Sequence, residues 1–230
     1  LEENGIPFLV LTNNSIFTNR DLSARLANSG LKVPEEHIWT SANATAAFLS
    51  QQSPNSTAYV IGEAGLTTAL HTAGYVMTDQ DPEYVVLGET RFYDFYALTT
   101  AIRLIERGAK FIATNPDVSG PSDEGTLPAA GSIAAMIQAA TGKAPYFVGK
   151  PNPVMIRAGL NKIGAHSEQA AMVGDRMDTD VRAGVEAGMR TFLVLSGSTH
   201  SDDVANFPYR PFRIYNGIGD LIRYVQPASN

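Results

Sequence analysis

The sequence predicts an α/β fold built on a mostly parallel, Rossmann-like sheet. Short apolar runs alternate with helix-like segments along the 230 residues, a pattern typical of strand–helix–strand units. Several apolar runs also end in polar or charged residues. Ligands in open α/β sheets bind at the carboxyl ends of the strands, so these residues are the first candidates for a functional site.

The first expected elements are a strand and two helices. Residues 7–11 are continuously apolar, as in strands that are buried on both faces of a parallel sheet. A helix is expected over residues 19–29, because Thr18 and Asp21 have the spacing of a capping box. A second helix is expected to begin near Ser41.

A further α/β block is expected between these elements and the second half of the chain. Its expected strands cover residues 58–61, 84–87 and 110–113. A helix over 94–107 would place one apolar face on them, formed by Leu98, Ala101, Ile102 and Ile105. We therefore predict one domain from residues 1–42 and 146–230, with a second domain, residues 43–145, inserted into it.

The chain then returns to the first domain. The remaining expected elements are strands over 146–148, 171–173 and 191–195, and helices over 154–162 and 219–225. Residues 116–131 are rich in Pro, Gly, Ser and acidic residues and are expected to form a long loop, either functional or a passive connection. Glu89 and Arg91 also follow a strand. They are expected to form a solvated ion pair, and the alternative is that they belong to the functional site.

Composition indicates a soluble enzyme with a real core. The hydrophobic content is 44%, and the formal net charge of −6 comes without a Lys/Arg block, which argues against a nucleic-acid partner. The absence of cysteine excludes disulfides and thiolate catalysis. No apolar run approaches a membrane span and no signal-peptide pattern occurs, so no membrane partner is expected and the cytoplasm is the expected location.

Two carboxylates mark the segment around residues 170–180. The apolar strand over 171–173 leads to Asp175 at its carboxyl end, and Asp180 follows in the first helical turn. Mg²⁺ prefers a few carboxylate oxygens together with water and substrate phosphate, so Asp175 is a candidate metal ligand. The alternative is that Asp178 or Asp180 only caps the helix.

The same pattern recurs at two other strand ends. Lys150 follows the strand over 146–148, where prolines fix the turn before a helix. Thr12, Asn13 and Asn14 follow the first strand, and their hydroxyl and amide groups suit a phosphoryl oxygen. Taken singly, Lys150 could be a surface lysine and Asn13–Asn14 an ordinary turn pair. Together with the acidic strand end, they indicate a phosphate and Mg²⁺ site.

These residues resemble a known family. Residues 12–15, 149–153 and 174–180 resemble, in order, the second, third and fourth motifs of the haloacid dehalogenase superfamily, and residues 114–117 resemble its NagD-like phosphatase branch. The resemblance implies a Rossmann-like core with an inserted α/β (C2-type) cap domain. It also implies a Mg²⁺-dependent phosphatase of small phosphorylated metabolites, such as sugar phosphates or nucleoside monophosphates, acting through an aspartyl-phosphate. Homodimers formed through the cap would fit this branch.

The resemblance also implies residue roles. The implied phosphate- and substrate-binding residues are Thr12, Asn13, Asn14, Lys150, Asn115 and Asp117. Thr12, with the Asn13 backbone N–H, would hold phosphoryl oxygens, and Lys150 would offset the charge between phosphate and carboxylates. Asp175 would bind Mg²⁺, while Asp180 would orient Lys150 or a metal-bound water.

One departure from the family pattern matters. The family's first motif, a strand ending in Asp-x-Asp-Gly whose first Asp is the nucleophile, should precede Thr12, but residues 1–11 contain no Asp. We expect that a strand, connection and helix of roughly 20–30 residues has been lost or is not recorded, and that the chain as written is inactive. Two alternatives stay open: a phosphate- or nucleotide-binding pseudo-enzyme, and a Rossmann-like nucleotide-binding module. The second alternative lacks a Gly-x-Gly-x-x-Gly after a strand.

Overall fold

The computed structural model of the protein describes residues 1–122 and 125–222. It divides into two compact units, one formed by Leu1–Leu9 and Lys150–Asn230, the other by Val10–Gly149. The predicted domain limits of residues 1–42, 43–145 and 146–230 stay a prediction. Within the described residues, no helix combines the length and the apolar character needed to cross a membrane.

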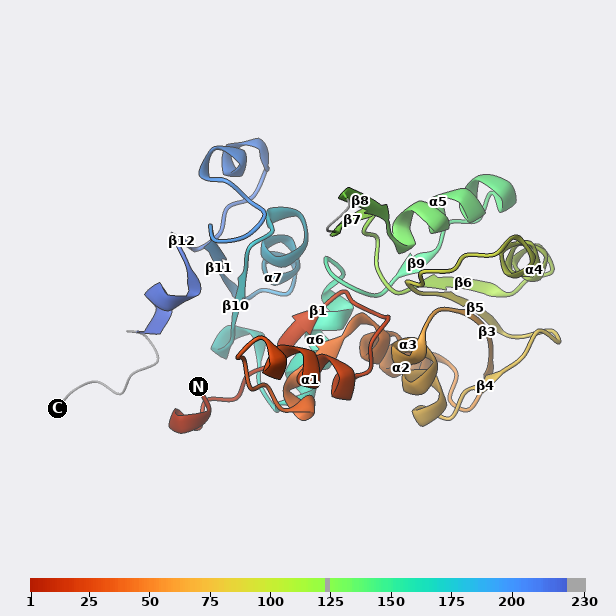
Figure 1. The fold of residues 1–230 in the computed structure, drawn as a ribbon, viewed down its shortest axis with the longest axis horizontal. Helices are drawn as coiled ribbons and strands as arrows, with labels where there is room; N and C mark the ends of the chain where they lie inside the picture. The colour runs from red at the N-terminus through yellow and green to blue at the C-terminus, as the bar shows by residue number, and fades with distance from the viewer. Residues whose placement is uncertain (123–124, 223–230) are drawn as a thin grey trace. The chain divides into compact units, whose positions relative to one another are not determined.

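The Val10–Gly149 unit is organised around a five-stranded, fully parallel sheet with strand order β4-β3-β5-β6-β9. Its strands are β3 (Thr57–Ile61), β4 (Val76–Met77), β5 (Tyr84–Leu87), β6 (Lys110–Ala113) and β9 (Tyr146–Phe147). Its helices are α2 (Ser41–Gln52), α3 (Ala64–Thr72), α4 (Phe95–Glu106) and α5 (Ala130–Thr141). Helices α4 and α5 lie on one face of this sheet, and α2 and α3 on the other (Figure 1).

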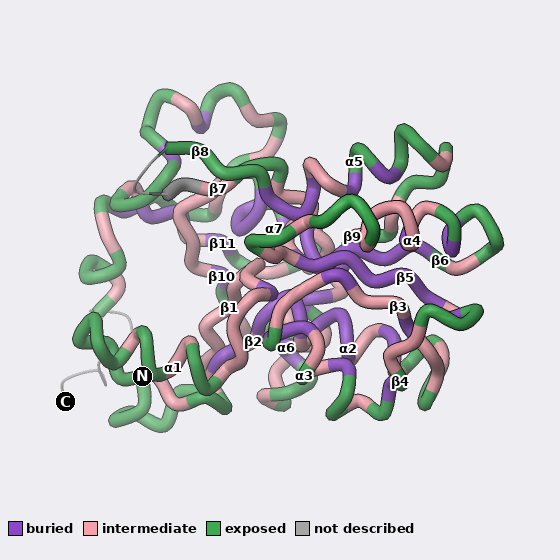
Figure 2. The backbone as a smooth tube through the Cα atoms, turned by 45° about the vertical axis from the view of Figure 1, so that its right-hand side comes forward, coloured by how far each residue is buried: buried purple, intermediate pink, exposed green. Residues whose placement is uncertain are grey.

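The core of this sheet confirms the predicted strand–helix alternation. All four residues of β5 are buried, and the buried chain continues into β6 between the two helix layers (Figure 2). Ala101 and Ile105 of α4 are fully buried as predicted, and Leu104 joins them. Removing the Leu104 and Ile105 side chains from water gains about 1.5–3 kcal/mol each, which helps to fix α4 on the sheet.

The same unit holds a two-stranded parallel sheet of β1 (Val10–Thr12) and β2 (Ile38–Thr40). Helix α1 (Asn19–Asn28) joins them and begins with the predicted capping box of Thr18 and Asp21. The expectation that the first strand is buried on both faces is wrong, since β1 is only half-buried. Among the described strands β1 pairs with β2 alone, so its other edge lacks a neighbouring strand that would cover it.

The other unit contains a three-stranded parallel sheet of β10 (Ala171–Gly174), β11 (Arg190–Val194) and β12 (Arg213–Tyr215). It also contains α6 (Pro153–Lys162) and α7 (Arg182–Glu186), and α7 is preceded by a π-helical turn over Met177–Val181. The predicted helix over 219–225 is a 3₁₀ turn over Ile218–Leu221, and residues 223–225 lie outside the described residues. The other short 3₁₀ turns cover Glu2–Asn4, Glu35–His37, Ser167–Gln169 and Ser201–Asn206.

Within the expected long loop over residues 116–131, the structure places two short antiparallel strands. Strand β7 (Ser119–Ser122) pairs with β8 (Gly125–Pro128), with Ser119 opposite Pro128 and Ser122 opposite Gly125. Pro and Gly usually argue against a strand. Both strands of a two-stranded ribbon are edge strands, however, where Pro is tolerated, and this explains why composition alone predicted a loop.

Candidate functional site

Lys150 and Asp180 form a nearly buried ion pair in the Lys150–Asn230 unit. Lys150 Nζ lies 2.7 Å from Asp180 Oδ1, and the two side chains are only 11% and 7% exposed. The reading of Lys150 as a solvated surface lysine therefore does not describe this structure. A buried ammonium held by a carboxylate keeps its charge and a fixed position, which suits a group that must meet an anion.

The second oxygen of Asp180 fixes the turn after β10. Asp180 Oδ2 accepts hydrogen bonds from the backbone N–H groups of Asp175, at 3.2 Å, and Arg176, at 3.1 Å. Gly174 allows this close approach, because a Cβ there would lie 2.3 Å from Asp180 Cβ. Asp178, by contrast, accepts from the Arg176 side chain at 2.7 Å and does not cap the helix. Asp180 therefore binds both the lysine and the turn that carries Asp175.

Asp175 lies directly after β10, as predicted, and its carboxylate is partly buried. Its Oδ2 accepts from the Ser198 backbone N–H at 2.7 Å. A Cβ on Gly197 would lie only 2.2 Å from the same oxygen, so glycine is needed there. Burial alone would raise the pKa of Asp175. The Ser198 hydrogen bonds and the Lys150 charge outweigh burial, so the pKa lies below its usual value and the carboxylate stays ionised at neutral pH.

Asp175 can serve as one ligand of a divalent cation but not as a complete site. The described residues hold no group of three or more His, Cys, Asp or Glu side chains arranged for a metal. Mg²⁺ usually keeps several waters and takes one or two carboxylates with substrate phosphate. The donor set at Asp175 fits a hydrated Mg²⁺ of this kind.

The residues predicted after β1 are tied to the loop that follows β6, within the Val10–Gly149 unit. Asn13 Nδ2 donates to Asp117 Oδ2 at 2.8 Å, and Asn115 Nδ2 donates to the Asn13 carbonyl at 2.9 Å. The Asp117 N–H donates to Asn115 Oδ1 at 3.1 Å. The structure thus brings Asn13, Asn115 and Asp117 into one network.

Thr12 and Asn14 shape the same turn. Thr12 Oγ1 accepts from the Asn14 N–H at 3.1 Å, and Asn14 Oδ1 accepts from the Phe17 N–H at 3.0 Å. The Asn14 side chain therefore stabilises the turn, which agrees for Asn14 with the alternative that Asn13–Asn14 is an ordinary turn pair. We refer to residues 12–15 below as the Thr12 loop.

Three polar residues of this network are not among the site residues predicted from the sequence. Ser15 is fully buried, and its Oγ accepts from the Glu89 N–H at 2.9 Å. Ser41 Oγ donates to the Asn13 carbonyl at 2.6 Å. Glu89 does not pair with Arg91 among the described residues but accepts from Asn115 Nδ2 at 3.3 Å, so the expected solvated ion pair is wrong. Glu89 lies just after β5, and this strand-end position was the available signal.

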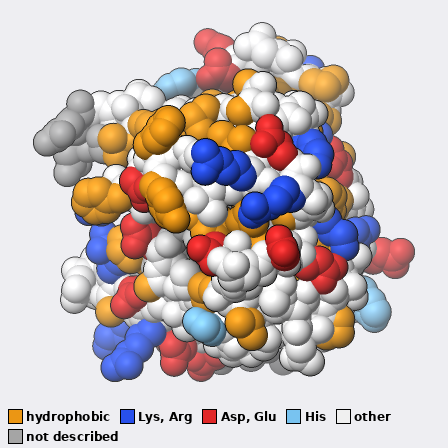
Figure 3. All heavy atoms as spheres, turned by 90° about the vertical axis from the view of Figure 1, so that its right-hand side faces the viewer, with side chains coloured by type: hydrophobic (Ala, Val, Ile, Leu, Met, Phe, Trp, Pro, Cys, Tyr) orange, Lys and Arg blue, Asp and Glu red, His pale blue; other side chains and the backbone are white. Residues whose placement is uncertain are grey.

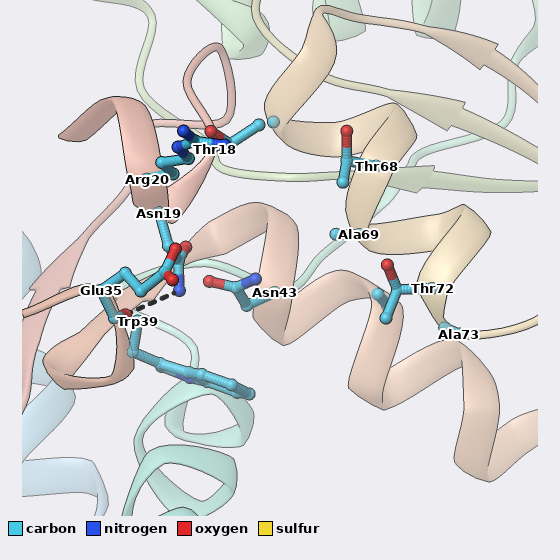
Figure 4. A pocket seen from close by; sticks show the side chains of 12 residues that line it. Thr18, Asn19, Arg20, Glu35, Trp39, Asn43, Thr68, Ala69, Thr72 and Ala73 are labelled. Carbon is cyan, nitrogen blue, oxygen red and sulfur yellow. Dashed lines mark hydrogen bonds between the residues drawn. The ribbon is translucent and has the colours of Figure 1, made fainter. Parts of the chain in front are cut away.

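Two cavities lie near these elements. The larger, of about 620 Å³, opens between α1, α2 and α3, with the Trp39 indole, Asn43 and Thr68 among its lining residues (Figure 4). None of the predicted site residues lines it. The smaller, of about 410 Å³, is lined by Arg176, Asp178 and Ser198 among others, next to Asp175.

Comparisons with known proteins identify the family. Residues 147–221 match a HAD-hydrolase-like family, and residues 1–76 match the haloacid dehalogenase-like hydrolases. The chain is 63% identical over 221 residues to a dihydroxyacetone phosphatase of Corynebacterium glutamicum, covering 96% of this chain and 80% of that protein. It is 44% identical over 219 residues to the ribonucleotide monophosphatase NagD of Escherichia coli, covering 95% and 86%.

Solved structures agree with the sequence comparison. The structure of NagD from E. coli K-12 superimposes with a TM-score of 0.90 at 43% identity, over 95% of this chain and 86% of that one. A 4-nitrophenylphosphatase from Thermotoga maritima superimposes with a TM-score of 0.92 at 35% identity, over 98% and 87%. The chain belongs to the haloacid dehalogenase superfamily, in its NagD-like branch of phosphatases. The predicted family and the predicted α/β fold class are therefore confirmed.

Proposed function

We propose that the protein is a phosphatase of small phosphorylated metabolites that carry hydroxyl groups, such as triose or sugar phosphates and nucleoside monophosphates. The observation that carries this proposal is the buried Lys150–Asp180 pair on the same turn that fixes the carboxylate of Asp175. The named activities of the relatives support it, since dihydroxyacetone phosphatase, NagD and an acid sugar phosphatase of Staphylococcus aureus, 38% identical over 227 residues, all act on such esters by name.

The proposal assigns a role to each cluster. The Thr12 hydroxyl and the Asn13 backbone N–H bind phosphoryl oxygens. Lys150 offsets the negative charge that grows on the phosphoryl group in the transition state, and Asp180 holds its ammonium in place so that little reorganisation is needed. Asn115, which is fully buried, positions Asn13 and Asp117 rather than touching substrate. Asp117 remains the proposed substrate-binding side chain of this loop.

Mg²⁺ is the proposed cofactor, with Asp175 as its protein ligand. When bound, the cation would neutralise phosphoryl charge and help to orient the ester. The chain's own residues prepare this position, because Ser198 and Gly197 fix the Asp175 carboxylate and Asp180 fixes the backbone that carries it.

A homodimer is proposed as the assembly. Phe92, Phe95 and Tyr96 are 83%, 86% and 74% exposed, although they lie within five consecutive residues around the start of α4. Hydrophobic side chains gather on the upper left of the face seen in Figure 3. Exposed apolar patches of this kind mark interaction sites, and a second copy is the proposed occupant. Sedimentation analysis of wild type and a Phe95→Ser/Tyr96→Ser variant tests this assembly. The cytoplasmic location stays a prediction, which cell fractionation can check.

A second candidate is a phosphate-binding protein without turnover. One observation favours it: both oxygens of Asp180 are already engaged, Oδ1 by Lys150 and Oδ2 by two backbone N–H groups, so this carboxylate serves to position other groups. This candidate predicts that the chain is inert toward p-nitrophenyl phosphate with Mg²⁺ but still binds inorganic phosphate.

One experiment tests the proposal and separates the two candidates. Phosphate release is measured from dihydroxyacetone phosphate, a sugar phosphate and a nucleoside monophosphate, with Mg²⁺ and with EDTA, for wild type and Lys150→Ala. The phosphatase predicts EDTA-sensitive release that Lys150→Ala lowers by roughly 10²–10³ in kcat, the scale for losing one preorganised stabiliser of charge. Absence of release from wild type, with phosphate binding intact, would favour the second candidate.

A further inference from the structure

Glu89 is a partly buried carboxylate that forms no ion pair with another described residue. It follows the carboxyl end of β5, between the ends of β3 and β6 in the sheet. Among the described residues, none of the ion pairs involves it. Burial raises the pKa of Glu89, and the hydrogen bond from Asn115 only partly offsets this. A carboxylate in such a place needs hydrogen-bond donors.

One side chain connects Glu89 to the Thr12 loop. Asn115 Nδ2 lies 3.3 Å from Glu89 Oε1 and 2.9 Å from the Asn13 carbonyl. The Glu89 N–H also donates to Ser15 Oγ, at the end of the same loop. A single side chain, Asn115, therefore separates Glu89 from the Asn13 backbone, which is proposed to bind phosphoryl oxygens.

The negative charge around Glu89 determines which kind of substrate group could bind to its carboxylate. A carboxylate offers about four acceptor sites and no donor. Asn115 occupies one of them through a long hydrogen bond of 3.3 Å, and the Ser15 backbone also donates a hydrogen bond to the carboxylate. The nearby Asp117 carboxylate adds a second negative charge. A negatively charged substrate group placed against Glu89 would be repelled, whereas an alcohol O–H donates a hydrogen bond to it without adding charge.

We propose that Glu89 determines substrate specificity by accepting a hydrogen bond from a hydroxyl group of the substrate. The site would then favour phosphate esters of polyols and sugars over esters of simple alcohols and phenols. This inference rests on the proposed binding of phosphate by the Thr12 loop. It adds a residue and a selection rule, since phosphate binding alone treats all phosphomonoesters alike.

A matched pair of ligands tests the inference without requiring turnover. Glycerol 3-phosphate and propyl phosphate share a three-carbon chain and a phosphate, and only the first carries hydroxyl groups. Titration calorimetry gives both dissociation constants for wild type and Glu89→Gln. Glutamine keeps the size of the side chain and one acceptor oxygen for Asn115, but it replaces the other oxygen with a donor.

The expected result is that Glu89→Gln changes the dissociation constant of glycerol 3-phosphate but not that of propyl phosphate. Wild type should bind glycerol 3-phosphate at least roughly tenfold more tightly than propyl phosphate, because the hydroxyl fills an acceptor that would otherwise be unpaired. Glu89→Gln should abolish this preference and leave the propyl phosphate affinity unchanged. Should Glu89→Gln fail to fold, Glu89→Asp replaces it. That variant keeps the charge but withdraws the carboxylate by one methylene, so it should also reduce the preference.

A matched control uses the neighbouring strand end. Glu63 follows β3 and accepts from Thr90 Oγ1 at 2.6 Å, so Glu63→Gln should keep the preference of wild type. Equal weakening of both ligands by Glu89→Gln would overturn the inference and make Glu89 a structural support of the Thr12 loop. An unchanged preference would overturn it as well. If wild type binds neither ester nor inorganic phosphate, the proposed function itself is wrong, and the inference fails with it.

Discussion

Lys150 Nζ contacts Asp180 Oδ1 at 2.7 Å where both side chains are almost excluded from solvent. Such a pair contributes little net stability compared with apolar residues, but removing one partner leaves a buried charge without compensation. Asp180 also holds two backbone N–H groups of the turn after β10. The pair therefore couples the position of the lysine to the position of Asp175.

The first prediction concerns this pair. Asp180→Ala should lower the free energy of unfolding by about 3–5 kcal/mol, the cost of breaking a buried pair from one side. Urea denaturation of the purified chain measures it. The control is Glu186→Ala, which breaks the exposed Arg182–Glu186 pair and should cost about 0.5 kcal/mol or less. Equal small losses in both variants would show that Lys150 is a surface lysine after all.

The second prediction concerns the glycine beside Asp175. In Gly197→Ala, the new Cβ would lie 2.2 Å from Asp175 Oδ2, so the carboxylate or the loop must move. We expect a loss of about 1–3 kcal/mol in stability, as for other overpacked sites, together with weaker Mg²⁺ binding. Gly219→Ala is the control, because a Cβ there meets nothing within 4 Å. If Gly197→Ala had the same melting temperature and the same Mg²⁺ affinity as Gly219→Ala, the close packing of Gly197 against Asp175 would not be needed for stability or for Mg²⁺ binding.

The strand ends could be predicted from sequence, but most contacts between the residues that follow them could not. An apolar run followed by Asp175 or Lys150 predicts a polar group at a sheet edge, and the structure places each one there. The family resemblance implies that Asp180 orients Lys150, and the structure pairs the two. Nothing in the spacing predicts that the other oxygen of Asp180 would bind two backbone N–H groups. That arrangement depends on a π-helical turn, which has no clear sequence signature.

Long-range contacts also explain what the sequence missed. Glu89 and Asn115 are 26 positions apart and meet only because β5 and β6 are neighbours in register, so Glu89 was expected to stay solvated beside Arg91. The ribbon of β7 and β8 was missed because a local signal was misleading: its Pro and Gly content predicts a loop. Local signals such as the Thr18 capping box were predicted correctly because all their atoms lie within one turn.

The third prediction is a pH dependence set by Glu83. Hydrogen bonds from Lys110, Ser56 and Ser53 lower the pKa of Glu83 from 4.5 to about 2 in the folded protein. A lowered folded pKa stabilises the folded state fully above the unfolded value, and this contribution is lost as the pH falls from about 5 toward 2. Because Lys110 is largely exposed, the contribution is modest.

Urea denaturation at a series of pH values checks this. Stability should fall less steeply on acidification in Glu83→Gln than in wild type. Glu106→Gln, at the exposed end of α4, should retain the wild-type slope. A Glu83→Gln slope identical to that of wild type would mean that the Ser53, Ser56 and Lys110 contacts do not hold the ionised carboxylate in solution.

The fourth prediction places substrate choice in the segment after β6. Asp117→Ala should change the ranking of dissociation constants across sugar phosphates and nucleoside monophosphates by roughly tenfold, about 1.4 kcal/mol, while changing a small generic ester much less. Asp79→Ala, at an exposed position, is the control. Because Asn13 Nδ2 donates to Asp117 Oδ2, a uniform loss across the panel would instead place Asp117 in support of the Thr12 loop. An unchanged panel would make the segment a passive connection.

The most direct test of the account is the equilibrium binding of inorganic phosphate to wild type and to Lys150→Ala, measured by titration calorimetry in the presence of Mg²⁺. Both candidate functions require a phosphate site at Lys150, whether or not the chain turns over an ester. The account predicts saturable binding by wild type that Lys150→Ala weakens at least roughly tenfold, about 1.4 kcal/mol. Equal affinity in the two proteins, or no binding by a folded wild type, would contradict it.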